Sequence, residues 1–243
     1  MRRRLNTYVW IASGACAIAV GWWLAYIWGY MSKNFTEVFA EIFGTVSFNR
    51  NGKWMQTLLI WILPQIVVLG FMGNAFEKIF FSARIMLMTR TQKIFKYIIS
   101  IIGEIELNVL WICVLEVGTF YITCAVMLKK LPQINYRLIG YICIFIMYQI
   151  FLVLFINALS LMTRASVAFL ITMIGEIVTV GLVRQIYISD NQKIEILQYF
   201  VPGLFGICPA NGKNIIILLC ELIALSGLVI FEMYLYLKNS EVL

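Results

Sequence analysis

Long apolar runs separated by short polar segments fill most of this chain. A helix that crosses a membrane needs about 20 consecutive, mostly apolar residues. Six runs reach that length, at 8–30, 55–76, 98–127, 138–162, 167–188 and 214–237. Because lipid offers no partners to backbone N–H and C=O groups, each run is expected to form an α-helix. The pattern predicts an all-α polytopic membrane protein, with residues 1–243 forming a single transmembrane domain of six helices.

Two of the segments between the runs are long enough to hold structure of their own. The first, 31–54, carries apolar residues at helical spacing, which predicts a short helix on the membrane surface. These residues are Phe35, Val38, Phe39, Ile42 and Phe43. The second, 189–213, has an apolar centre that is interrupted by Pro202, Gly203, Gly206 and Pro209. It is too short to cross, so we expect a re-entrant or interfacial hairpin.

The composition agrees with this pattern. Of 243 residues, 62% are hydrophobic and only 13% are charged, whereas a soluble domain has about 25% charged residues. No polar stretch is long enough to form a separate soluble catalytic domain. The chain has no histidine, which excludes Ser-His hydrolases and zinc sites that contain histidine. We therefore expect no enzymatic activity in this chain.

One loop superficially resembles a phosphate-binding motif. The stretch GICPANGKN, from Gly206 to Asn214, contains two glycines and a lysine. A phosphate-binding loop requires four residues between its glycines, followed by Lys and then Ser or Thr. Here five residues separate Gly206 from Gly212, and Asn214 follows Lys213. We expect this chain to bind no nucleotide and no other cofactor.

The formal net charge of +7 does not indicate binding to nucleic acid, because the cations lie at the ends of the apolar runs. Cations at these places meet lipid headgroups. The basic start of the chain, Arg2–Arg4, favours a cytoplasmic N-terminus. Six spans then place the C-terminus and the segment 77–97 in the cytoplasm too. The later loops oppose this orientation, because Lys129, Lys130 and Arg137 would lie outside and the turn between the fourth and fifth spans holds only Arg164. The orientation of this multi-pass cell-membrane protein therefore rests on its first half.

Several carboxylates lie inside the predicted spans, namely Glu104, Glu116, Glu176 and Glu221. A charge at bilayer depth costs about 2.5–3.5 kcal/mol on insertion scales, so such groups usually pair, take a proton or face a cavity. No Lys or Arg lies near mid-span to pair with them. In one interpretation they carry protons or line a translocation path for cationic cargo. In the other they only fix packing, by bonding to Asn108, Gln149, Asn157, Thr172 or Thr179.

Small residues recur every four positions in the first span. They are Ser13, Ala17, Gly21 and Ala25. Such a stripe lets another helix approach closely in a membrane. Two partners are open for this helix-packing surface: another helix of the same chain, or a second subunit.

The segment 77–97 has a distinctive order of residue types. Glu77 ends the second span, an apolar patch and a Thr89-Arg90 step follow, and a basic turn leads to Lys96 at the start of the third span. This order resembles the region between the second and third spans of ABC-2-type transporter permeases. The six spans, the small-residue first span, the long third span and the broken hairpin before the last span are also similar. The family commonly has Pro and Gly where this chain has Thr91 and Phe95.

The resemblance implies a function. Segment 77–97 would be a coupling helix that docks on a cytoplasmic ABC ATPase, present in two copies, and ATP and Mg would be used by that partner. The residues implied in coupling are Arg84, Thr89, Arg90, Lys93 and Lys96. A second transmembrane subunit, identical or related, would complete the path. The small size resembles the subset that exports peptides or bacteriocins, or confers immunity to them, in bacterial plasma membranes.

Two other functions stay open. The intramembrane glutamates also suit a proton-coupled secondary carrier, although the chain shows no inverted repeat. A non-transport role, as a membrane-embedded assembly factor, is the third candidate.

Overall fold

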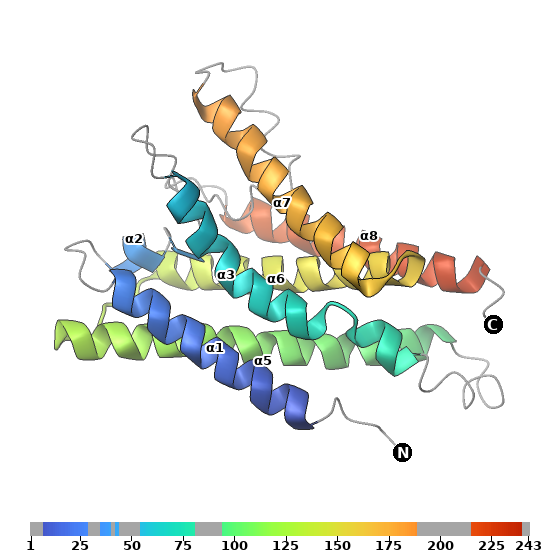
Figure 1. Cartoon of the computed structure of the whole chain (residues 1–243), viewed down its shortest axis with the longest axis horizontal. Helices are drawn as coiled ribbons and strands as arrows, with labels where there is room; N and C mark the ends of the chain where they lie inside the picture. Colours follow the sequence, from blue (N-terminus) through green and yellow to red (C-terminus); the bar gives the residue numbers. More distant parts are fainter. Residues whose placement is uncertain are drawn as a thin grey trace.

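A computed structural model describes residues 7–28, 35–39, 42–43, 54–80, 94–188 and 215–239. Within these ranges the chain is helical and contains no strand, which confirms the all-α prediction. The helices, shown in Figure 1, are α1 (Thr7–Trp28), α2 (Phe35–Phe39), α3 (Trp54–Met72), α5 (Ile94–Leu128), α6 (Tyr136–Met162), α7 (Ala165–Ile188) and α8 (Ile215–Asn239). A further short helical segment at 75–80 follows α3.

Five helices are long and apolar enough to cross a membrane. Their candidate spans are Tyr8–Ile27, Leu58–Phe80, Phe95–Leu128, Tyr136–Met162 and Ile215–Lys238. These spans identify the chain as a membrane protein. The apolar helix found within α7, Ala165–Val178, is shorter than a span. The described residues therefore account for five of the six predicted spans, and the sixth stays a prediction.

The helices α1 and α5 lie side by side and run in the same direction (Figure 1). Near the start of α1, Trp10 stacks on Trp111, with 4.9 Å between the ring centroids. Toward the end of α1, Gly21 faces Thr119. The residue numbers of the contact partners increase in the same direction along both helices, so α1 and α5 are parallel.

The helices α3 and α6 are also parallel. Trp61 stacks on Tyr148 at 6.1 Å between ring centroids. Farther along both helices, the backbone carbonyl of Met72 accepts a hydrogen bond of 2.7 Å from the Asn157 amide. α5 leads into α6 through the short segment 129–135, so these two neighbours are antiparallel.

The last two helices continue this alternation. α7 follows α6 after a short turn at 163–164 and returns along it, since Tyr148 contacts Glu176. α8 begins beside the beginning of α6, because a Cβ atom on Gly140 would lie 2.9 Å from the side chain of Ile215. α8 therefore runs parallel to α6.

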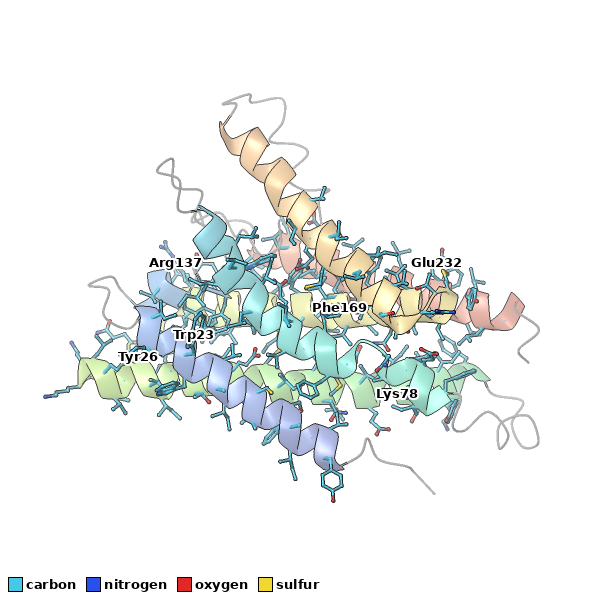
Figure 2. The ribbon with its side chains drawn as sticks, viewed as in Figure 1. Trp23, Tyr26, Lys78, Arg137, Phe169 and Glu232 are labelled. Carbon is cyan, nitrogen blue, oxygen red and sulfur yellow. The ribbon has the colours of Figure 1, made fainter. Side chains whose placement is uncertain are left out.

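Consecutive long helices thus alternate in direction, as successive membrane crossings require. We call the end where α1 begins the proximal end, and the end where α1 finishes the distal end. Phe95, in the first turn of α5, contacts Tyr234, near the end of α8, so α1, α5 and α8 all have an end on the proximal side (Figure 1). Figure 2 places Lys78 and Glu232 toward the proximal end and Arg137 toward the distal end.

Aromatic side chains close the distal part of the bundle. Phe35 and Phe43 lie 5.7 Å and 5.2 Å from Phe120 of α5, measured between ring centroids. Phe43 also contacts Phe145 of α6 at 5.0 Å. Phe39 is fully buried. The short helix expected in 31–54 is therefore present as α2, and its aromatic face packs on α5 and α6.

The end of α3 is shaped by a polar side chain from α6. The helix breaks at 73–74 and resumes at 75–80. Asn157 donates a hydrogen bond to the Met72 carbonyl, and its Oδ1 accepts one of 2.9 Å from the Phe76 amide. A Cβ on Gly73 would lie 2.7 Å from Ile156. Asn157 thus satisfies the backbone groups that the break exposes, and glycine allows the close approach.

Candidate functional site

The small-residue stripe of α1 lies on the face that packs against α5. Its members Ser13, Ala17, Gly21 and Ala25 are all buried. A Cβ atom on Gly21 would contact the backbone carbonyl oxygen of Glu116 and would lie 3.1 Å from Cβ of Thr119. In this structure the stripe serves packing between two helices of the same chain.

Glu116 lies in the middle of α5, and its side chain is fully buried. Neither of its carboxylate oxygens has a hydrogen-bond partner among the described residues. No Lys or Arg occurs in 97–128 or, on α6, in 138–162. Burying a carboxylate without a partner costs far more than packing usually returns. Packing alone therefore does not explain a glutamate at this position.

Two glutamines share this property. Gln149 of α6 is fully buried, and neither its Oε1 nor its Nε2 has a partner among the described residues. Gln65 of α3 is only 1% exposed, and its Oε1 is likewise without a described donor. Native proteins leave few buried polar groups unpaired, so such groups call for a functional explanation.

Glu176 of α7 is paired on one side only. Its Oε1 accepts a hydrogen bond of 2.5 Å from the hydroxyl of Tyr148 on α6. Its Oε2 has no partner in the described part of the chain. The ring of Tyr148 is held by the stacked Trp61 of α3, so three helices meet at this pair.

The helix α8 contributes two more groups of the same kind. Oε2 of Glu221 and Oγ of Ser226 are buried and have no hydrogen-bond partner in the ranges that the structure describes. These residues lie about one and a half turns apart on α8, so their polar atoms lie at neighbouring levels.

The contacts between helices set the depth of each group. Phe120 and Phe145 meet at Phe43. Glu116 precedes Phe120 by one turn, and Gln149 follows Phe145 by one turn. Since α5 and α6 are antiparallel, both steps lead toward the proximal end, and Glu116 and Gln149 lie at the same level.

The other groups fall at this level too. Glu176 is level with Tyr148 through their hydrogen bond. Gln65 lies one turn beyond Trp61, which stacks on Tyr148. Gly140 of α6 lies beside Ile215 of α8, and the two helices are parallel. Counting along both helices from this contact places Glu221 and Ser226 within about one turn of the level of Gln149.

We call this set the mid-depth polar layer. It consists of Gln65, Glu116, Gln149, Glu176, Glu221 and Ser226. It is roughly 10 Å thick along the helix axes. Every buried side-chain oxygen or nitrogen that lacks a partner in the described ranges belongs to one of these residues.

The alternative that neighbouring polar side chains satisfy the glutamates holds in part for Glu176, but through Tyr148 and not through one of the residues suggested from the sequence. Asn157 bonds to the break after α3, and Asn108 bonds to Trp10 of α1. Thr172 donates to the carbonyl of its own helix, and Gln149 has no described partner. The side chain of Thr179 lies outside the described residues.

Glu104 is separate from the layer. It lies on α5 about three turns closer to the proximal end than Glu116, and it is partly exposed. Its backbone carbonyl accepts a hydrogen bond of 2.6 Å from Asn108. Of the four glutamates singled out from the sequence, three therefore lie in the layer and one lies outside it.

The predicted coupling residues lie mostly outside the described residues. This holds for Arg84, Thr89, Arg90 and Lys93, and for the hairpin expected at 189–213. Lys96 is described, and it is exposed in the first turn of α5 at the proximal end.

Sequence reasoning did not assign Gln65 and Tyr148 to the site, and it treated Gln149 only as a neighbour. The available signal was the occurrence of amide side chains deep inside apolar runs, where polar residues are rare and usually functional. What the sequence could not show is that they share one level.

Comparison with known proteins finds no match to the chain among family models, curated proteins or solved structures. Within the described ranges no group of three or more His, Cys, Asp and Glu side chains is placed to hold a metal ion.

Proposed function

We propose that this chain is the membrane-spanning subunit of an ATP-driven exporter similar to the ABC-2-type permeases. The observation that carries the proposal is the mid-depth polar layer, in which Glu116, Gln149 and Gln65 are buried without described partners. In this proposal all six long helices cross the cell membrane, and both termini are cytoplasmic. The cargo is an amphipathic peptide or a lipid-like compound.

A transport path explains why polar groups without partners persist at this depth. In the closed bundle each of these groups loses its hydrogen bonds to water, at a cost of about 1–3 kcal/mol per group. Water or the polar groups of a cargo molecule would restore those bonds when the helices separate. The layer therefore favours an arrangement that opens, which is what a transport cycle needs.

The energy source in this proposal is a separate pair of ABC ATPase subunits that use ATP and Mg. They would bind the basic segment 77–97, between α3 and α5, on the cytoplasmic side. A second transmembrane subunit, the same or related, would form the other wall of the path. Arg84, Thr89, Arg90, Lys93 and Lys96 would form the contact with the ATPase.

The test is capture of the ATPase from the native membrane. Tagged wild-type protein should co-purify with a P-loop ATPase, and the R90A/K93A variant should lose it while remaining folded. The matched control is K129A/K130A, which removes two exposed cations at the distal end and should retain the ATPase. Normal capture and normal transport by R90A/K93A would contradict the coupling role.

A second candidate is favoured by a specific observation. The Tyr148–Glu176 hydrogen bond, together with Glu116 nearby in depth, provides exchangeable protons within the layer, as a proton-coupled carrier would require. Transport that persists without ATP but stops when the proton gradient is removed would favour this carrier. A stable native complex that contains no ATPase would instead favour an assembly factor.

A further inference from the structure

Three buried polar side chains of the layer lie at one level on α3, α5 and α6, which pack against one another. Glu116 lies one turn nearer the proximal end than Phe120, and Gln149 lies one turn nearer the proximal end than Phe145. Phe120 and Phe145 both contact Phe43, and residues four apart share a helix face. Glu116 and Gln149 therefore lie on the facing sides of α5 and α6.

Gln65 lies at this level on α3. It lies one turn after Trp61, on the same face of the helix. Trp61 stacks on Tyr148, the residue next to Gln149. Gln65 is 1% exposed, and Glu116 and Gln149 are fully buried, so none of the three side chains reaches the outer surface of the bundle.

The atoms without partners have a definite chemistry. They include both carboxylate oxygens of Glu116, Oε1 of Gln149 and Oε1 of Gln65. These are four acceptor oxygens, two of them in a carboxyl group that carries one negative charge when ionised, accompanied by one donor, Nε2 of Gln149. No Lys or Arg occurs within 54–77, 97–128 or 138–162. Oxygen atoms of carboxylates and amides are the ligands that hard cations select.

The charge balance specifies the kind of cation. A single buried carboxylate is neutralised by one unit of positive charge, whereas a divalent ion would leave an uncompensated charge away from water. The described residues also offer no group of three or more carboxylate, Cys or His ligands.

We propose that Glu116, Gln149 and Gln65 form a binding site for one dehydrated monovalent cation, either an alkali-metal ion or a primary ammonium group. The site is internal to α3, α5 and α6 and does not depend on an ATPase partner. Its occupant supplies the positive charge that α3, α5 and α6 lack at this depth.

The experiment measures cation binding by the purified full chain in detergent. Thermal unfolding is followed by tryptophan fluorescence in chloride salts of sodium, potassium and methylammonium. N-Methylglucamine chloride, whose cation is too large for the site, provides the same ionic strength. Wild-type protein should show a saturable rise in unfolding temperature with at least one small cation, and no such rise with N-methylglucamine.

Substitutions test whether the rise in unfolding temperature depends on the proposed site. E116Q removes the charge and should abolish the saturable rise, and Q149M should weaken cation affinity by at least tenfold. E106Q is the matched control, since Glu106 lies on the same helix but is only half-buried and outside the layer. This control should respond to cations as the wild type does.

The results distinguish an inorganic cation from the ammonium group of an organic ligand as the occupant of the site. A response to sodium or potassium supports an inorganic ion, and a response to methylammonium alone supports the ammonium group of an organic ligand. Direct binding of radioactive sodium or rubidium to the wild type should approach one ion per chain in the first case. The proposal is overturned if no small cation exceeds N-methylglucamine in the wild type, or if E116Q or Q149M binds as tightly as the wild type.

Discussion

Gly21 of α1 lies directly against the backbone of Glu116 in α5, so close that a Cβ atom on the glycine would overlap the Glu116 carbonyl oxygen. The contact joins the small-residue stripe to the mid-depth polar layer. It sets how closely α1 can approach the segment of α5 that carries the buried carboxylate. A change at Gly21 therefore acts on the layer through the backbone.

Replacing Gly21 by alanine should loosen the packing of α1 on α5. The added methyl group meets backbone atoms that cannot move aside, and overpacking of this kind costs about 1–3 kcal/mol. G118A is the matched control, because a Cβ at Gly118 has no neighbour within 4 Å and alanine favours the helix by about 1 kcal/mol. Unfolding in SDS should show G21A below the wild type and G118A at or above it; equal stability of the two variants would contradict the contact.

Replacing Tyr148 by phenylalanine should destabilise the protein through Glu176. The ring can still stack on Trp61, but the carboxylate loses its only described hydrogen bond. Leaving a buried acceptor unpaired costs about 1–3 kcal/mol. E176Q keeps an acceptor oxygen for the tyrosine and removes the buried charge, so it should be milder. A Y148F variant as stable as the wild type would show that the hydrogen bond contributes nothing.

Replacing Asn157 by alanine should weaken the break that follows α3. Three described hydrogen bonds of its side chain are lost: to the Phe76 amide, to the Met72 carbonyl and to the Val153 carbonyl. The Phe76 amide loses an acceptor in a buried site, and we expect a loss of about 1–3 kcal/mol. S160A is the control, since the described hydrogen bond of Ser160 stays within its own helix and its loss should cost about 1 kcal/mol or less. Hydrogen exchange at 75–80 should increase in N157A and stay unchanged in S160A.

The alternating directions of the helices predict which residues share a side of the membrane. In a variant without the six native cysteines, K78C should react with a membrane-impermeant maleimide from one side only. R137C should react from the other side. T163C, in the turn between α6 and α7, should behave as K78C does. Labelling of K78C and R137C from the same side would contradict the six-span arrangement.

The sequence was sufficient for the positions of the long helices. The apolar run 138–162 coincides closely with α6, Tyr136–Met162, because a membrane span needs a continuous apolar surface. The third run, 98–127, was predicted shorter than α5, Ile94–Leu128. A helix can extend beyond the lipid where its terminal turns carry polar residues such as Lys96. Hydropathy does not mark the residue at which such a helix ends.

The polar layer could be predicted only in part. Glu116 and Glu176 stood out because a charge in an apolar run is conspicuous. Gln65 and Gln149 did not, since an uncharged amide is less costly and its level depends on how helices pair. That pairing rests on long-range contacts such as Trp61 with Tyr148, which no local pattern encodes.

The central claim is that the mid-depth polar layer lines a path that opens. The most direct measurement is the reactivity of Q149C toward a small, charged thiol reagent, in a cysteine-free background and in native membrane vesicles. I156C is the control, because Ile156 is equally buried on the same helix but lies about two turns away. Q149C should react, and ATP should change its rate, while I156C stays inert. If Q149C is as unreactive as I156C with and without ATP, the layer is a closed structural feature and the proposed transport path is wrong.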